Sequence, residues 1–376
     1  MPISRRQLNR ATLARQSLLC RESGTAVEAV RSAVALQAQE PASPYLALWN
    51  RVEGFDAADL DNAFATQSVV KASLMRITLH AVAGEEYTTF HEAMVRNLRA
   101  SRLNDRRFTS TGYSTPDADA LVPWLLRQLT TPRTGPEIEA ALAERLGRDP
   151  ERLWWAIRTF APIAHAATGG PWSFARRPSY RPAPREPARG SAHVALQQLI
   201  LRYLEGFGPA SAQDFGQFAL QRQAEIKPAI EALSDELVRL EGPEGQTMWD
   251  MRGGAIPHGD VEAPPRLLGM WDSILLAYAD RSRVIPEAYR STVIRRNGDV
   301  LPTLLVDGHV AGVWRPIEGG IEARAFHALT PHHWEGLAAE ASALLAFLAD
   351  RDPTVYGRYG RWWDFIDAAE TRLLAD

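Results

Sequence analysis

The chain has 376 residues, enough for two or three domains, and its 45% hydrophobic and 23% charged residues exclude a disordered or fibrous protein. Its single cysteine excludes a disulfide scaffold and a cysteine-based metal site. The net charge of −3 excludes binding of nucleic acid through a diffuse excess of positive charge, so any DNA-binding surface must be local.

The N-terminal segment, MPISRRQLNR, lacks the apolar core of a secretory signal, and no run approaches the roughly 18 apolar residues of a membrane-spanning helix. We therefore expect a cytoplasmic protein without a membrane segment. Lys71 and Lys227 are the only lysines. Chemistry that proceeds through a Schiff base thus has few amines to use.

The first region, residues 1–125, is expected to begin with helices. The run TAVE that starts at Thr25 is a capping box, in which the threonine hydroxyl and the glutamate carboxylate satisfy free amides at a helix start. In residues 76–83, apolar side chains alternate with Arg76, Thr78 and His80. This alternation predicts a strand whose polar face carries these three residues.

The second and third regions, residues 126–190 and 191–265, share one order of elements: helix, turn, helix, hairpin. Each has a capping-box pattern at the start of a helix, at Thr134 and at Ser211. In the second region, residues 163–174 hold a Gly-Gly-Pro turn between two apolar runs and are expected to form the hairpin. This order is typical of winged helices, and the first region resembles a less regular copy of it.

Residues 178–190, rich in proline and arginine, are expected to form an extended linker. The last region, residues 266–376, differs from the others because it is rich in strands. Its strongest signal is a hairpin over residues 300–314 that turns at Asp307-Gly308. The chain is thus predicted to be α+β and predominantly helical, with three tandem winged-helix units and a β-rich C-terminal region. A basic loop tip precedes the hairpin and contains Arg295, Arg296 and Asn297.

Gln37 and Gln39 lie just before Pro41, where a helix must end. If the chain is extended there, both amides project to one side; if it is helical, they diverge. From the pattern alone, such glutamines are solvated or capping groups. No nucleotide-binding loop, zinc-protease motif or nucleophile-elbow motif occurs, so the residues alone indicate only tandem winged helices.

Several segments nevertheless resemble one family. The run LQAQEPASPYLALWNR, residues 36–51, is similar to the N-terminal signature of the bacterial AlkZ/YcaQ family of winged-helix DNA glycosylases. The resemblance spans almost the whole chain, in order. The other matching segments are residues 74–80, 271–272, 278–283, 296–298 and 306–315.

The resemblance implies a monofunctional glycosylase that hydrolyses the N-glycosidic bond of N7-alkylated purines, including crosslinked guanines, and leaves an abasic site. It makes Gln37 and Gln39 the catalytic pair and implies no metal or cofactor. The partner would be duplex DNA, bound by a monomer along a C-shaped surface, with a C-terminal hairpin reaching into the minor groove. Self-resistance to a DNA-crosslinking natural product is the implied role. The expected DNA contacts are Lys71, Arg76, His80, Arg295, Arg296 and Asn297.

Two alternatives remain open from the sequence. Tandem winged helices without catalysis are also typical of a drug-responsive transcription regulator. A protein that sequesters the drug would use some of the 11 tryptophans to line a pocket. Within the glycosylase interpretation, relatives often have Gln-x-Asp, so the group that accepts the proton from water is open. Glu40 is adjacent but lies outside the motif.

Overall fold

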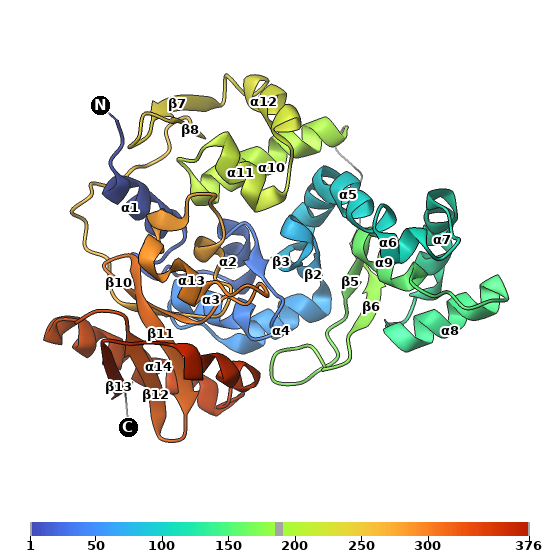
Figure 1. Cartoon of the computed structure of the whole chain (residues 1–376). Helices are drawn as coiled ribbons and strands as arrows, with labels where there is room; N and C mark the ends of the chain where they lie inside the picture. The colour runs from blue at the N-terminus through green and yellow to red at the C-terminus, as the bar shows by residue number, and fades with distance from the viewer. Residues whose placement is uncertain (1, 185–190, 375–376) are drawn as a thin grey trace.

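The computed structural model describes residues 2–184 and 191–374 and combines helices with four small sheets (Figure 1). Each sheet is formed by strands from one of the four regions. A continuous cluster of buried apolar side chains nevertheless includes residues from all four, so the regions pack on a shared core. The expected border at residue 125 lies inside a helix that ends at Gln128, rather than in a linker. None of the described helices is long and apolar enough to cross a membrane.

The first region surrounds a three-stranded antiparallel sheet of order β1-β3-β2. The capping box at Thr25 is present at the start of α2. Its elements are α1 (Arg5–Arg15), α2 (Ala26–Ser32), β1 (Leu36–Gln37), α3 (Ser43–Arg51), α4 (Ala57–Thr66), β2 (Val69–Ser73), β3 (Leu79–Ala83), α5 (Tyr87–Leu103), α6 (Arg106–Thr109) and α7 (Thr115–Gln128).

The second region differs from its prediction in the hairpin. β5 pairs with a strand at Ser179–Pro182, inside the predicted linker, and residues 169–174 form a connecting loop instead. The strand at Ser179–Pro182 is favoured as the partner of β5 because its Tyr180 buries its ring edge-on against Trp154. Residues 185–190 of the predicted linker lie outside the described part of the chain. The elements are β4 (Arg133–Thr134), α8 (Gly135–Leu146), α9 (Leu153–Phe160), β5 (Ile163–His165) and β6 (Ser179–Pro182).

The third region has the predicted order of helices followed by a hairpin. The hairpin turns within residues 242–246, and the capping box at Ser211 is present. Helix α10 packs against α5 of the first region (Figure 1). The elements are α10 (Ala192–Phe207), α11 (Ala212–Ala219), α12 (Gln223–Glu231), β7 (Leu237–Glu241) and β8 (Thr247–Met251).

The last region contains a five-stranded antiparallel sheet of order β13-β12-β11-β10-β9. Helix α14 packs against this sheet. The short 3₁₀ helices at Arg281–Arg283 and Gly357–Phe365 belong to the loops around it. The elements are β9 (Arg266–Leu268), α13 (Arg290–Val293), β10 (Thr303–Val306), β11 (His309–Ile317), β12 (Gly320–Ala325), α14 (Pro331–Ala349) and β13 (Glu370–Leu374).

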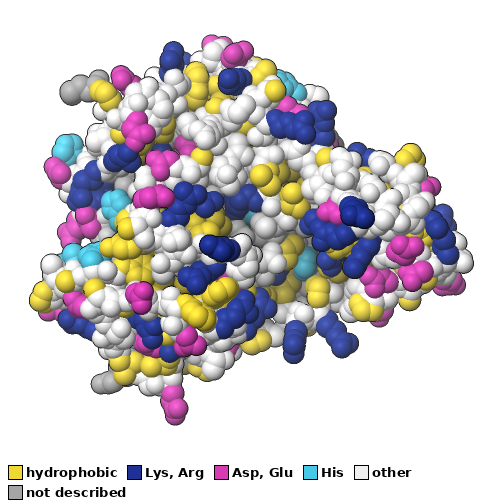
Figure 2. Space-filling model, viewed as in Figure 1, with side chains coloured by type: hydrophobic (Ala, Val, Ile, Leu, Met, Phe, Trp, Pro, Cys, Tyr) yellow, Lys and Arg dark blue, Asp and Glu magenta, His cyan; other side chains and the backbone are white. Residues whose placement is uncertain are grey.

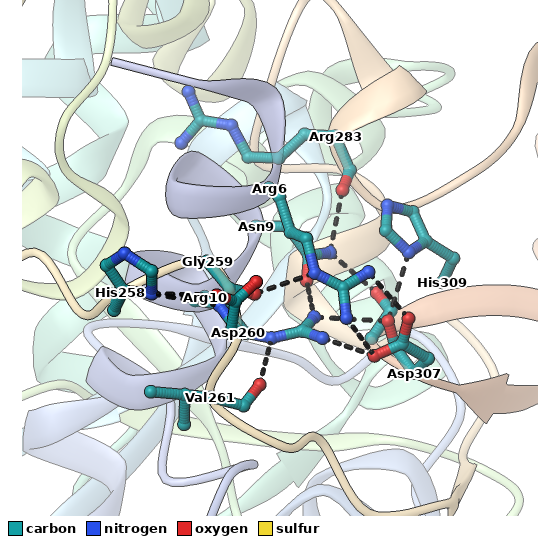
Figure 3. A network of polar contacts seen from close by, with 11 residues as sticks. Arg6, Asn9, Arg10, His258, Gly259, Asp260, Val261, Arg283, Asp307 and His309 are labelled. Atoms are coloured by element: carbon teal, nitrogen blue, oxygen red, sulfur yellow. Dashed lines mark hydrogen bonds and ion pairs between the residues drawn. The ribbon is translucent and has the colours of Figure 1, made fainter.

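The predicted Asp307-Gly308 turn joins β10 to β11 and packs against α1 (Figure 3). The Asp307 carboxylate pairs with Arg6 and with the buried Arg10, and Asn9 Nδ2 donates to the Gly308 carbonyl at 2.7 Å. Gly308 has φ 77°, and a Cβ there would lie 2.3 Å from the Asn9 Oδ1 atom, so only glycine fits. The tip of this hairpin is therefore held against the protein and is not free to enter a DNA groove.

Candidate active site

Gln37 lies in the short strand β1, and Gln39 lies in the bend that follows it. β1 pairs antiparallel with β3, with Gln37 opposite His80, and the Ala38 amide continues the ladder by donating to the Leu79 carbonyl at 2.8 Å. Helix α2 has already ended at Ser32. Gln39 follows in the bend between the end of β1 and α3, so the segment is not helical at either glutamine. The helical geometry left open by the sequence is therefore excluded.

The two amides differ in exposure and in partners. Gln37 is 5% exposed, whereas Gln39 is on the surface. The Gln37 Oε1 atom accepts a hydrogen bond from Arg76 Nη2 at 2.8 Å. Because a guanidinium can only donate, the amide oxygen of Gln37 must face it. The Gln39 side chain has no hydrogen-bond partner among residues 2–184 and 191–374, and its amide is open to solvent.

Arg76 reaches Gln37 from a turn, not from a strand as predicted. β3 begins at Leu79, and both Arg76 (φ 53°) and Ile77 (φ 59°) have left-handed backbone conformations. Left-handed conformations of non-glycine residues cost about 1–3 kcal/mol each and occur where surrounding contacts impose them. Here the Arg76 guanidinium is held by the Gln37 amide, by the Phe218 carbonyl of α11 at 3.2 Å, and by His80.

His80 is a buried hydrogen-bond partner of Arg76. Its Nδ1 donates to the Thr78 carbonyl at 3.1 Å, so Nε2 is the acceptor for Arg76 Nη2, also at 3.1 Å. Burial, followed by the charge of Arg76, lowers the pKa of His80 to about 3. The ring is 1% exposed and neutral. This corrects the expectation that His80 contacts DNA, because it orients Arg76 from inside the protein.

Lys71 is also buried, contrary to its expected contact with a phosphate. It lies on β2 opposite Ala81, which places it on the other face of the sheet from Gln37 and His80. Its Nζ atom is 4.2 Å from the centroid of the Phe174 ring, and the residue is 3% exposed. Burial lowers the pKa of Lys71 to about 7, although the charge of Glu40 opposes this shift.

Glu40 is tied to the C-terminal region instead of facing the glutamine pair. Its carboxylate forms an ion pair with Arg358 and accepts a hydrogen bond from the Tyr359 hydroxyl at 3.2 Å. Burial raises the pKa of Glu40. The charge of Lys71 acts on this pKa in the opposite direction, which places Glu40 near Lys71.

The predicted basic loop tip is a tight turn, closed by a hydrogen bond from the Gly298 amide to the Arg295 carbonyl at 3.0 Å. The guanidinium of Arg295 lies 4.7 Å from the Trp362 ring centroid. The Asn297 amide group donates to the Asp299 carboxylate, and its oxygen accepts from the Asp299 backbone amide. Arg296 is exposed and has no hydrogen bond or ion pair within the described part of the chain. The turn therefore presents Arg296 and Asn297 on the surface.

Arg281 and Arg290 were not among the predicted site residues. Burial lowers the pKa of Arg76 to about 10, and the charge of Arg281 adds to this shift. Burial likewise lowers the pKa of Arg281, and the charge of Arg290 adds to it. Figure 2 shows Lys and Arg side chains gathered over the middle of the viewed face, around α13 (Arg290–Val293). Arg281 lies in the family-like segment of residues 278–283, which was the one sequence signal that pointed to it.

The described residues contain no group of three or more His, Cys, Asp or Glu side chains that could hold a metal ion. Residues 30–347 match a protein family described as "DNA glycosylase AlkZ-like". A solved structure, the Streptomyces sahachiroi DNA glycosylase AlkZ, is similar with a TM-score of 0.78 and 20% identity, over 92% of this chain and 96% of that one. No curated protein matches the sequence. The chain belongs to the AlkZ-like DNA glycosylase family and is an enzyme that acts on DNA.

Proposed function

We propose that the enzyme is a monofunctional glycosylase for N7-alkylated purines, including guanines joined in interstrand crosslinks, and that it leaves an abasic site without a metal. Gln37 and Gln39 are its catalytic pair. The observation that carries the proposal is their setting: two amides two residues apart at the end of an edge strand, one fixed by Arg76 and the other open to solvent.

The chemistry suits amides because of the leaving group. Alkylation at N7 makes the purine cationic, so it departs as a neutral base and needs no general acid. The enzyme must then position water and stabilise positive charge developing on the sugar. Amide carbonyls do both as dipoles, and a preorganised polar contact of this kind is worth about 2.7–4 kcal/mol.

The two glutamines take different parts in this scheme. Gln37 has one lone pair of Oε1 occupied by Arg76 and a second lone pair left for water or the sugar. Gln39, on the surface, contacts the sugar of a nucleotide that remains in the duplex. The proton released when water adds to the sugar carbon passes to solvent on the open side.

The proposal extends to the DNA-binding mode and the biological role. A monomer binds duplex DNA along a C-shaped surface lined by three winged-helix units, with Arg296 and Asn297 as contacts at the loop tip. The role is self-resistance to a DNA-crosslinking natural product. A deletion strain should then be more sensitive to the crosslinking agent than to a simple methylating agent. Equal sensitivity to both would indicate general repair.

The first test uses duplex DNA with one N7-methylguanine, EDTA in the buffer, and alkaline cleavage of abasic sites. We expect excision by the wild type and loss in Gln37→Ala and Gln39→Ala with DNA binding retained. Gln128→Ala, a change to a half-buried glutamine at the end of α7, is the matched control and should excise normally. Tight binding by the wild type without base release would favour a transcription regulator.

A further inference from the structure

Arg281 is a half-buried cation whose charge has no acidic partner. It begins the 3₁₀ helix Arg281–Arg283, and its buried Nε atom has no hydrogen-bond partner in the described part of the chain. The neighbouring Asp280 is engaged elsewhere: it accepts from the Ser282 amide at 2.9 Å and lies 4.0 Å from Arg5. An uncompensated, partly buried charge is unfavourable, so its presence needs an explanation.

Two neighbouring arginines make the burial of the Arg281 charge more unfavourable. Burial lowers the pKa of Arg76, and the nearby charge of Arg281 lowers it further. The hydrogen-bond partners of Arg76 are all neutral: an amide, a carbonyl and an uncharged imidazole. Arg290 adds a third positive charge, and its acidic neighbour, the exposed Glu287, is 3.9 Å away. The three guanidiniums thus form a positive cluster whose one ion pair among the described residues is the long contact between Arg290 and the exposed Glu287.

Other arginines with largely buried side chains pair with acids: Arg51 forms two hydrogen bonds of 2.8 Å with Asp272, and Arg15 pairs with Asp250 at 2.7 Å. Arg283 lacks an acid but is held by the Tyr278 ring. The positive cluster thus differs from these pairs, in a chain of net charge −3. Exceptions of this kind are typical of sites that receive an anionic ligand.

We propose that Arg281 and Arg290 bind a backbone phosphodiester of the damaged DNA strand beside the target nucleotide, with Arg76 as the inner wall of the site. This inference rests on the proposed glycosylase function. Guanidiniums match phosphate oxygens through paired N–H donors. Because Arg76 is bonded to Gln37, a phosphate held here places the adjoining sugar against the catalytic amides.

The phosphate also has an electrostatic role. Positive charge develops on the sugar as the base departs, and the charges of Arg76 and Arg281 alone would oppose it. A phosphodiester between the guanidiniums and the sugar supplies the missing negative charge. The same contact thus positions the substrate and removes a repulsion that the empty site would impose.

The test compares Arg281→Gln and Arg290→Gln with Arg283→Gln, a matched control two residues from Arg281. Arg283 is 8% exposed and lies 4.0 Å from the Tyr278 ring centroid, inside the protein. We measure DNA affinity against salt concentration on undamaged and damaged duplexes. Each lost phosphate contact should make the slope of log K against log salt less negative by about 0.9. Arg283→Gln should leave the slope unchanged.

Methylphosphonate substitution identifies which phosphate is bound. A neutral linkage at one position flanking the lesion should weaken wild-type binding about as much as Arg281→Gln does, and should cause no further loss in that variant. Inorganic phosphate is titrated separately, without DNA. If it binds the wild type and not Arg281→Gln, while every methylphosphonate is tolerated, the site takes free phosphate and the proposal is wrong.

Stability separates a binding role from a structural one. Arg281→Gln removes an unpartnered charge, so its melting temperature should equal or exceed that of the wild type, whereas Arg283→Gln should be less stable. An unchanged salt slope in a folded Arg281→Gln protein overturns the inference. Because the readout is binding, it fails separately from the glycosylase proposal, which depends on base release.

Discussion

The Nη2 atom of Arg76 lies 2.8 Å from the Oε1 atom of Gln37 and donates a hydrogen bond to it. The buried glutamine of the pair is thus oriented by a cation rather than by a carboxylate. Arg76 is in turn fixed by the neutral ring of His80 and by the Phe218 carbonyl. The position of Gln37, one of the two proposed catalytic amides, therefore depends on a turn of the first region and a helix of the third.

The Arg76–Gln37 hydrogen bond should be measurable as an energetic coupling. Arg76→Ala and Gln37→Ala should each slow single-turnover excision, and the double variant should be little slower than the worse single one. A hydrogen bond to a charged group contributes about 1.5–3 kcal/mol, which is roughly a 10- to 150-fold effect. Additive losses would show that the two residues act independently. Binding should be measured in parallel, because Arg76 also borders the proposed phosphate site.

The range of lesions should follow the charge of the leaving base. Because an exposed Gln39 does not require the nucleotide to be flipped fully out of the duplex, bulky and crosslinked N7-alkylguanines should be excised as well as N7-methylguanine. Uracil and mismatched bases should remain, because a neutral base needs a general acid to depart. Release is measured by single-turnover assays on matched duplexes. Excision of small methyl adducts alone would contradict the proposed capture within the duplex.

Gln39→Asp should be active, unlike Gln39→Ala. The side chain is on the surface, so a carboxylate can replace the amide without desolvation. Excision of N7-methylguanine by Gln39→Asp should equal or exceed the wild-type rate, and its rate should fall at acidic pH as the carboxylate is protonated. Gln39→Ala should be slower by about 10²- to 10³-fold. Equal inactivity of both variants would assign Gln39 a role specific to an amide.

Lys71 should not act as a lyase nucleophile. Although its lowered pKa of about 7 provides neutral amine near neutral pH, the side chain lies on the opposite face of the sheet from Gln37. Borohydride should therefore trap no covalent complex with DNA, and strands should remain intact until alkali is added. Lys71→Met should keep wild-type excision and stability. Trapping that disappears in Lys71→Met would show that the amine reaches the abasic site.

His80 should contribute to acid destabilisation. Its pKa is about 3 in the folded protein and 6.5 ordinarily, so between these values the unfolded chain binds the proton and the folded one does not. The free energy of unfolding should therefore fall as pH decreases below 6.5, by at most about 1.4 kcal/mol per pH unit from this residue. Denaturant unfolding of His80→Gln should show a smaller pH slope over this range. An unchanged slope would mean that the ring is protonated in the folded state.

The sequence predicted features that depend on neighbouring residues. The capping boxes at Thr25, Thr134 and Ser211 all form, because their hydrogen bonds span only three residues. The turn at Asp307-Gly308 forms for the same reason. The motif around Gln37 was found through its resemblance to a family, since two glutamines before a proline carry no chemical signal of their own.

Tertiary contacts decided the backbone conformation at Arg76 and the burial of Lys71. Alternation over residues 76–83 predicted a strand, but contacts of Arg76 with Gln37 and Phe218 draw its segment into a left-handed turn. The burial of Lys71 depends on Phe174 from the second region.

What the sequence by itself determined is the order of helices and hairpins and the family motif, both encoded in short runs. Only the tertiary structure decided that Arg76 is bonded to Gln37 and that Arg281, which has no acidic partner in the described chain, is near enough to act on Arg76. Their charges act through space between segments far apart in the chain, and no local pattern records that their acidic partners are missing.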